Sequence, residues 1–246
     1  MALRERVLAD VRAAFQSEPR FEPRAHLELD FSDGTLTIEG EVPNVAVKKL
    51  LLERGAAHPA VVGIVDRLRV APAQRMGDGQ IRDLVRDALL EEGALAEMAI
   101  HAVVKGETLI VREPPAARGT ISIEVDDGVV TLDGVLPSLA HKRLAGVLAW
   151  WVPGSRDVIN GLDVSPPEED TDEEITDAVR MALEKDPFVD ATQIRVSTRD
   201  GVVTLTGMVP KAAEREMAEF DAWYVFAVDK VENQVVVGPA EATGQR

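Results

Sequence analysis

The sequence predicts an α+β fold of three tandem α-β-β-α-β modules, each a small mixed three-stranded sheet packed by two helices. Three observations predict it. The same landmarks recur three times at fixed spacing, an alternating apolar run follows each Asp-Gly pair, and an amphipathic helical pattern precedes each pair. Self-similarity at fixed spacing indicates repeated modules, and helices beside a short sheet form an α+β layer arrangement.

The first landmark is an Asp-Gly pair between two alternating runs. Because glycine accepts positive φ, such a pair predicts a tight β-hairpin. The pairs precede the runs TLTIEG, VVTLDG and VVTLTG, and their glycines are Gly34, Gly128 and Gly201.

A second glycine, a proline and a short polar residue follow each pair at constant distances. The second glycine is expected to end the second strand or to mark a bulge in it. The proline is expected near the first turn of a helix, where its fixed φ suits the backbone. The polar residue lies in an apolar run that predicts a third strand. These positions are Gly40, Gly134 and Gly207 for the glycine, Pro43, Pro137 and Pro210 for the proline, and Asp66, Asn160 and Asn233 for the polar residue.

A helix is also expected ahead of each hairpin. In the second module, apolar residues from Ile81 to Leu89 recur at i, i+3, i+4 and i+7, which is the spacing of one helix face. In the third module, Thr171 and Glu174 form a capping box before the apolar stripe.

The landmarks divide the chain into residues 1–72, 78–165 and 170–238, followed by a flexible tail at 239–246. The second module carries an insertion at about 99–118, where Lys105-Gly106-Glu107 between two apolar runs predicts an extra hairpin. The insertion is either a functional elaboration or a tolerated surface addition, since loops accept both.

Composition limits the classes of function. The formal net charge is −16, which repels phosphate backbones and argues against nucleic-acid binding. The chain has no cysteine, so disulfides and thiolate metal sites are excluded. No targeting segment or membrane-spanning stretch is visible. We therefore expect no cofactor and no metal, and a cytoplasmic location, or a periplasmic one if a leader has been removed.

The acidic residues do not predict catalysis. Asp127 and Asp200 recur with the turn glycines, so the hairpin explains them. The acidic segment from Glu168 to Glu174 does not match a calcium loop and is interpreted as a solvated linker. No nucleophile elbow, phosphate loop or zinc-binding helix motif is present, and we expect no enzyme activity.

Two aromatic pairs are the candidate binding residues. They lie late in the predicted second helices and are Trp150, Trp151, Trp223 and Tyr224. Adjacent helical residues point about 100° apart, so an outward-facing ring could contact a lipid interface or a protein. The alternative is packing between modules, because large apolar side chains usually lie inside.

The runs VVTLDG and VVTLTG, the helices after them and the strands around Asn160 and Asn233 resemble the BON domain family of bacteria. The resemblance covers nearly the whole chain as three copies. In the first copy, TLTI replaces VVTL and Asp66 stands where Asn is usual. The resemblance implies the same α-β-β-α-β fold.

The resemblance also implies a function. BON proteins are mostly linked to phospholipid binding, envelope maintenance and osmotic shock, and one cytoplasmic member is linked to potassium. We therefore expect a non-enzymatic scaffold that binds a phospholipid surface or a hydrophobic partner in stress or envelope physiology. Two alternatives stay open: a cytoplasmic small-ligand or potassium-like cation sensor, and a structural protein–protein interaction module that could form homo-oligomers.

Overall fold

The computed structural model describes residues 3–17, 19–20 and 27–238. The chain divides into two compact units, Met1–Ala73 and Gln74–Arg246, called here the N-terminal and C-terminal units. The flexible tail expected at 239–246 lies outside the described residues.

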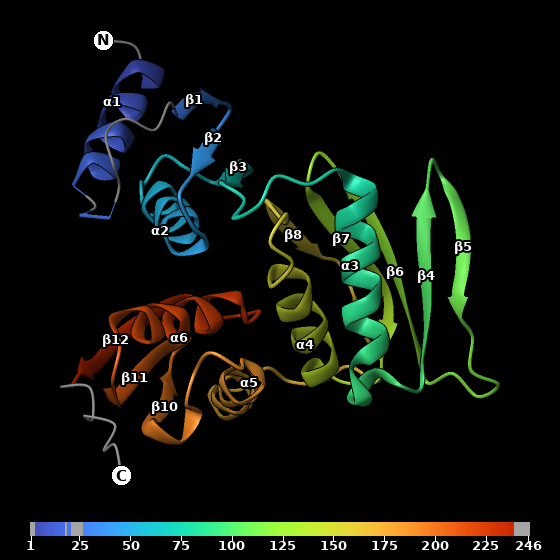
Figure 1. The fold of residues 1–246 in the computed structure, drawn as a ribbon. Helices are drawn as coiled ribbons and strands as arrows, with labels where there is room; N and C mark the ends of the chain where they lie inside the picture. Colours follow the sequence, from blue (N-terminus) through green and yellow to red (C-terminus); the bar gives the residue numbers. More distant parts are fainter. Residues whose placement is uncertain (1–2, 18, 21–26, 239–246) are drawn as a thin grey trace. The chain divides into compact units, whose positions relative to one another are not determined.

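The N-terminal unit is one α-β-β-α-β module (Figure 1). Its apolar core joins Val7, Val11 and Phe15 of the first helix to Leu36 and Leu51. The sheet order is β1-β2-β3, with β1 and β2 antiparallel and β2 and β3 parallel. The elements are α1 (Leu3–Gln16), β1 (Leu27–Ser32), β2 (Thr35–Val42), α2 (Val45–Ala56) and β3 (Gly63–Val70).

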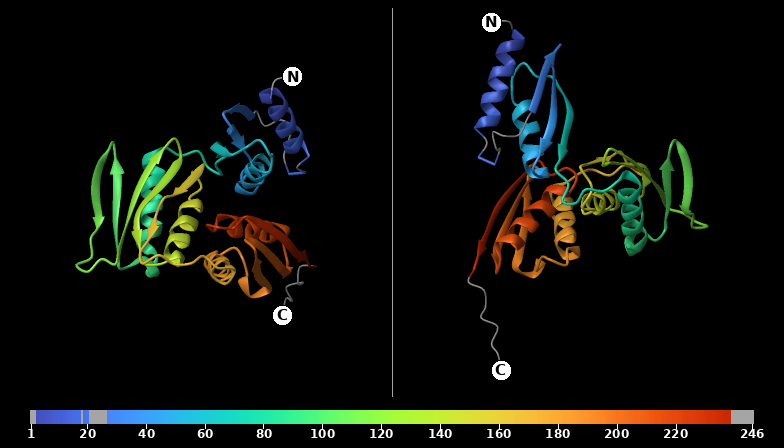
Figure 2. Two further views of the ribbon diagram at one scale, coloured as in Figure 1. Left: turned by 180° about the vertical axis from the view of Figure 1, so that it is seen from behind. Right: turned by 45° about the horizontal axis from the view of Figure 1, so that its top comes forward.

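The second module begins the C-terminal unit and has an enlarged sheet of order β5-β4-β6-β7-β8, with β9 also pairing with β7. Strands β4 and β5 form the hairpin within the inserted segment and place β5 at the sheet edge. Helices α3 and α4 cover one face (Figure 2). The elements are α3 (Asp78–Glu91), β4 (Met98–Val104), β5 (Glu107–Arg112), β6 (Gly119–Asp126), β7 (Val129–Leu136), α4 (Leu139–Trp150), β8 (Asp157–Asn160) and β9 (Asp163–Val164).

The third module completes the C-terminal unit with a sheet of order β10-β11-β12. Helix α5 packs on β10, and α6 packs on β12. The capping box predicted at Thr171 and Glu174 is present at the start of α5. The elements are α5 (Asp172–Lys185), β10 (Ile194–Arg199), β11 (Val202–Val209), α6 (Ala212–Tyr224) and β12 (Lys230–Val237). The α+β fold of repeated modules is thus confirmed.

The Asp-Gly pairs form the predicted tight hairpins. Both residues of each pair have positive φ, between 47° and 50° for the aspartates and between 72° and 80° for Gly34, Gly128 and Gly201. Two successive positive φ angles match a type I′ turn, whose twist suits the flanking strands.

The second glycine differs from its prediction. Gly40, Gly134 and Gly207 lie inside β2, β7 and β11, with φ between 136° and 145° and no register shift. A Cβ on Gly134 would lie 2.1 Å from the carbonyl oxygen of Thr120 on the neighbouring strand. The glycine is therefore required by a close backbone approach within the ladder, not by a strand end or a bulge.

The prolines lie just before the first turn of each second helix. Pro43 and Pro137 each precede the N-cap residue, Asn44 or Ser138, whose side chain accepts a hydrogen bond from the first turn. Pro210 likewise precedes the N-cap position of α6. A proline φ also suits the extended residue before a cap. In α2 and α4 the cap itself keeps a residue with a side-chain acceptor, whereas Lys211 of α6 makes no side-chain cap hydrogen bond.

Candidate functional site

Three of the four candidate aromatic residues, Trp150, Trp151 and Tyr224, make contacts between the second and third modules within the C-terminal unit. Trp150 ends α4, and Tyr224 ends α6. Their rings stack with centroids 5.5 Å apart and planes 15° apart. Trp223 is 1% exposed, and the other three rings are half-buried. This is the geometry of packing between modules.

Polar contacts surround the stacked rings. The Trp151 indole Nε1 donates to Asp221 Oδ1 at 2.9 Å. The Lys142 ammonium lies 4.5 Å from the centroid of the Phe226 ring. At the other end of the contact, Lys185 of α5 pairs with Glu92 after α3 at 2.8 Å. We call this set of inter-module contacts the junction.

Arg143 is the buried cation of the junction. Its guanidinium pairs with the Asp170 carboxylate and donates through Nε to the Phe226 carbonyl oxygen at 3.4 Å. A buried guanidinium is costly unless it is paired and hydrogen-bonded. The junction therefore joins α4, the segment before α5 and the loop after α6 into one unit.

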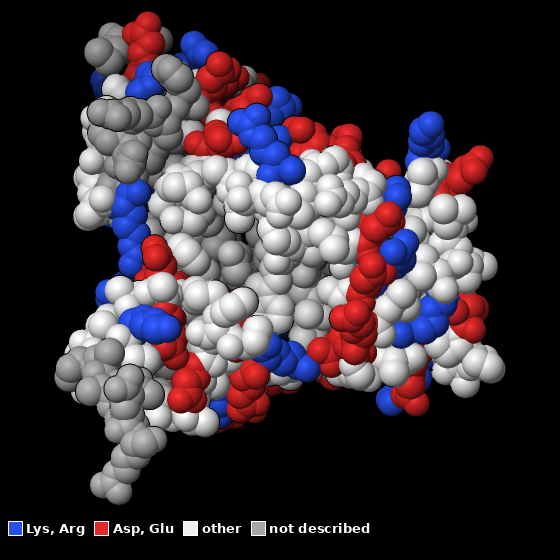
Figure 3. All heavy atoms as spheres, viewed as in Figure 1, with Lys and Arg blue, Asp and Glu red and all other residues white. Residues whose placement is uncertain are grey.

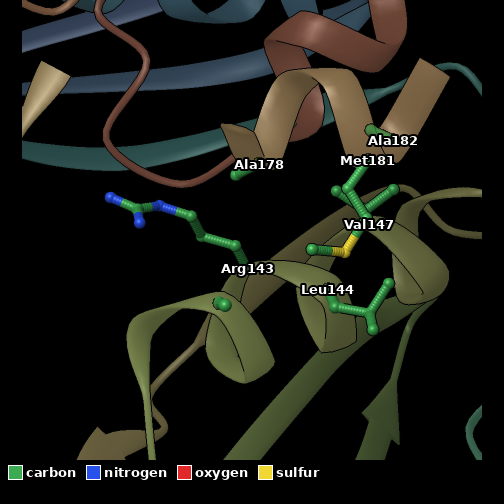
Figure 4. A pocket seen from close by; sticks show the side chains of 7 residues that line it. Arg143, Leu144, Val147, Ala178, Met181 and Ala182 are labelled. Atoms are coloured by element: carbon green, nitrogen blue, oxygen red, sulfur yellow. The ribbon is translucent and has the colours of Figure 1, made fainter. Parts of the chain in front are cut away.

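A shallow hollow lies between α4 and α5. Its cavity volume is about 10 Å³, which is far below the roughly 300–1,000 Å³ of typical ligand pockets. Its apolar lining includes Leu144, Val147 and Met181, and the Arg143 side chain runs away from them (Figure 4). The hollow is an imperfection of helix packing rather than a ligand pocket.

Asp221 is the carboxyl group most altered by the junction. Burial raises the pKa of Asp221 to about 8, with Asp186 adding to the rise and the Trp151 hydrogen bond opposing it. Burial raises the pKa of Tyr224 to about 12, and the nearby carboxyl groups of Asp221 and Asp186 add to the rise. Perturbed groups of this kind mark functional or strained places in a fold.

The polar residues of the third strands have a structural role. The Asn160 and Asn233 side-chain amides donate to the backbone carbonyls of Lys142 and Arg215, each at 2.8 Å. In the N-terminal unit the Lys48 ammonium instead pairs with Asp66 at 2.9 Å. These side chains link the second helix of each module to its third strand.

Two first-turn aspartates, which sequence reasoning missed, hold the hairpin turns. The Asp78 carboxylate accepts from the amides of Asp127 and Gly128 at 3.2 and 2.8 Å. The Asp172 carboxylate accepts from the amides of Asp200 and Gly201 at 2.8 and 3.0 Å. The sequence contains a signal for these contacts, because an aspartate stands at the start of the first helix in both modules. Its separation from the turn glycine is longer in the second module than in the third only because of the insertion in the second module.

Helix α3 carries charged side chains on its exposed face. Arg86 of α3 pairs with Asp83 at 3.1 Å and with Asp87 at 2.8 Å, and such side chains run as a stripe beside uncharged surface (Figure 3). Within the described residues, three or more His, Asp or Glu side chains nowhere group as a metal site. No helix in that part of the chain is long and apolar enough to span a membrane.

Comparison with known proteins identifies a matching family. The family model described as "BON domain" matches residues 107–166 and 171–239. Osmotically-inducible protein Y of Escherichia coli (strain K12) is 33% identical over 121 residues, which are 47% of this chain and 60% of that protein. The chain thus spans less than two thirds of that relative.

Two solved structures of CdsD, a structural protein of the type III secretion system of Chlamydia trachomatis, are also similar. The C-terminal domain is 17% identical with a TM-score of 0.26, covering 95% of this chain and 98% of that one. The second is 18% identical with a TM-score of 0.27, covering 96% and 94%. Similarity at this level carries no argument about function.

Proposed function

Because this chain belongs to the BON domain family, we propose that it is a non-enzymatic binding and scaffold protein of osmotic-stress or envelope physiology. The junction is the observation that carries the proposal. At the junction, the candidate aromatics, Arg143 and Asp221 hold the second and third modules together. Because their helices pack on each other there, the sheet edges of the C-terminal unit are left to bind a partner. The similarity to Osmotically-inducible protein Y supports the physiological setting.

We further propose that the N-terminal unit is a third BON module. It lies outside the family match, yet it has the same element order and the same sheet order as the third module. Its Asp33-Gly34 turn and Gly40 adopt the backbone angles of the other copies. Its departures, such as Asp66, are compensated within the unit by Lys48.

The partner in this proposal is a hydrophobic protein segment that pairs with β5. Ile110 on this edge strand is 68% exposed, and Leu109 beside it is also exposed. The central residues of β5, Thr-Leu-Ile-Val, carry no charge, whereas protected edges usually carry charges or proline. An extended peptide adds to such an edge by main-chain hydrogen bonds.

A genetic experiment tests this role. We expect cells that lack the protein to recover slowly after a hyperosmotic shift, and the Ile110→Lys variant to behave like the deletion. Val62→Lys is the matched control, since Val62 is an exposed apolar residue of the N-terminal unit. Normal recovery of the deletion strain would contradict the role, and normal recovery with Ile110→Lys would contradict the β5 edge.

Phospholipid binding is the second candidate, and two exposed rings favour it. Phe188 is 70% exposed, and the exposed Phe226 carries the Lys142 ammonium over its face. An aromatic ring beside a cation suits a headgroup interface. Co-sedimentation with phosphatidylcholine vesicles, with and without anionic lipid, tests it: binding that Phe188→Ser weakens supports it, and a chain that stays in the supernatant contradicts it.

A further inference from the structure

The Asp33–Gly34 turn of the N-terminal unit is built like the hairpin turns of the other two modules. The two φ angles of each turn are 49° and 80° in the first module, 47° and 73° in the second, and 50° and 72° in the third. In each turn the glycine carbonyl oxygen accepts a hydrogen bond from the backbone amide of the residue just before the third strand. These bonds run to Gly34 from Val62 at 2.8 Å, to Gly128 from Arg156 at 2.9 Å and to Gly201 from Asp229 at 3.0 Å. The three turns therefore hold their own amides in the same orientation.

The turns differ in what their amides bind. In the second and third modules, the carboxylates of Asp78 and Asp172 accept from the two amides of the turn at distances between 2.8 and 3.2 Å. In the part of the chain that the structure describes, the amides of Asp33 and Gly34 donate to no acceptor. Successive amides presented by a tight turn form a concave site for an anion. The first module thus leaves open a site that the other modules fill with their own side chains.

An arginine stands in the first helix where the other modules have the aspartate. Each first helix buries apolar residues four positions apart, and these stripes begin at Val7, Ile81 and Ile175. The residue three positions before the stripe is an aspartate in α3 and α5 and is Arg4 in α1. Arg4 donates to Asp30 Oδ1 of β1 at 2.6 Å, which holds its guanidinium beside the strand that leads into the turn. A guanidinium has five N–H donors, so Arg4 keeps donors for a second oxyanion.

We propose that the amides of Asp33 and Gly34, together with Arg4, bind the carboxylate of an aspartate or glutamate side chain from a partner protein. The other two modules indicate the class of ligand, because the same pair of amides holds a carboxylate there. The Asp33 carboxylate does not close the site, since Asp127 and Asp200 stand at the same position of turns whose amides are occupied. The site belongs to the N-terminal unit and not to β5, so it goes beyond the proposed function and does not depend on it.

The site is open to a partner and carries little opposing charge. Asp33 is exposed, Gly34 is half-buried, and the Arg4 side chain is 60% exposed. Residues 1–73 carry 10 Lys and Arg residues against 11 Asp and Glu residues, whereas the whole chain has a formal net charge of −16. Charges more than about 10 Å apart are largely screened at roughly 0.1 M salt. The N-terminal unit therefore repels an incoming carboxylate less than the C-terminal unit does.

The experiment follows the backbone amide signals of the full chain by proton–nitrogen NMR at neutral pH and constant ionic strength. A short peptide with blocked termini and a single aspartate is added. We expect the Asp33 and Gly34 signals to shift and to saturate, and the same peptide with asparagine in place of aspartate to leave them unchanged. The Gly128 and Gly201 signals are the control within the molecule and are expected to stay in place, because a carboxylate already occupies those amides.

Three variants sharpen the test. Asp172→Ala frees the turn of the third module, so the Gly201 signal is expected to gain a saturable response to the aspartate peptide. Arg4→Gln is expected to weaken binding at Gly34 by about two- to fivefold, the usual size of an exposed charge pair. Arg67→Gln, at an exposed arginine of β3, is the matched control and is expected to bind the peptide as the wild type does.

The same titrations can contradict the site. A Gly34 signal that does not shift, or that shifts equally with the asparagine peptide, would overturn the proposal. Equal responses of Gly34 and Gly201 in the wild-type chain would also overturn it, since binding would then not depend on an open turn. Unchanged affinity in Arg4→Gln would contradict the part given to the arginine. Acetate serves as a free small carboxylate, and if it bound more tightly than the peptide, the ligand would not be a protein side chain.

Discussion

Lys48 places its ammonium nitrogen 2.9 Å from Asp66 Oδ2 at the position where the other modules use an asparagine. The residue equivalent to Lys48 is Lys142 or Arg215, fourteen residues after the turn glycine in each case. Its backbone carbonyl accepts from Asn160 or Asn233. An aspartate carboxylate cannot donate to that carbonyl, so the first module replaces the amide link with a buried lysine.

Lys48→Met is predicted to destabilise the N-terminal unit by about 1–3 kcal/mol, because it leaves the Asp66 carboxylate without its ammonium partner. Adding Asp66→Asn should restore most of the loss, since the amide can donate to the carbonyl of residue 48. Hydrogen exchange of β3 in the full chain measures both effects. A double variant no more stable than Lys48→Met would contradict this account of the link.

Gly207→Ala is predicted to lower the free energy of unfolding by about 2–4 kcal/mol through backbone strain and collision. The new Cβ would lie 2.0 Å from the Gln193 carbonyl oxygen, at a φ of 140°. Gly93→Ala is the control, because its Cβ would meet nothing within 4 Å. Urea unfolding compares them, and equal midpoints would show that the close approach is not a constraint.

Asp172→Ala is predicted to cost about 0.5–1.5 kcal/mol, the usual net value of lost hydrogen bonds to solvent-accessible amides. The carboxylate accepts from the Asp200 and Gly201 amides. Glu173→Ala removes a charge from the same helix turn and so controls for the helix dipole. If the two variants lose equal stability, the turn bonds contribute nothing beyond charge.

Asp221 gives the stability of the C-terminal unit a definite pH dependence. Its pKa rises on folding from 3.8 to about 8, so between these values the folded state binds more protons than the unfolded state. The contribution to stability is complete below about pH 4 and is lost as the pH rises through about 8. Asp221→Asn should flatten this fall. Denaturant unfolding at several pH values measures it, and a wild-type stability that rises with pH while Asp221→Asn stays flat would reverse the assigned sign.

Local landmarks in the sequence predicted the fold well because the residues that form each turn or cap lie close to one another in the chain. The Asp-Gly turns and the capping box of Thr171 and Glu174 are examples. The one error among these landmarks, the place of Gly134 within its strand, concerns backbone detail, because glycine suits a strand end, a bulge and a close backbone approach alike.

The junction could not be predicted in the same way. Trp151 and Asp221 are 70 residues apart, and their contact depends on how two modules pack together. Repetition revealed that the aromatic pairs were equivalent, but not that Trp150 would stack on Tyr224. Either pair could have faced solvent with the same sequence spacing, since each module has a core of its own.

We propose that the aromatic pairs hold the second and third modules together rather than forming a lipid-binding surface. Acrylamide quenching of the three tryptophans, at neutral pH with and without phospholipid vesicles, tests it most directly. Buried and stacked rings predict weak quenching that vesicles leave unchanged. Strong quenching in buffer, with a blue shift of emission and protection from acrylamide when vesicles are added, would contradict it.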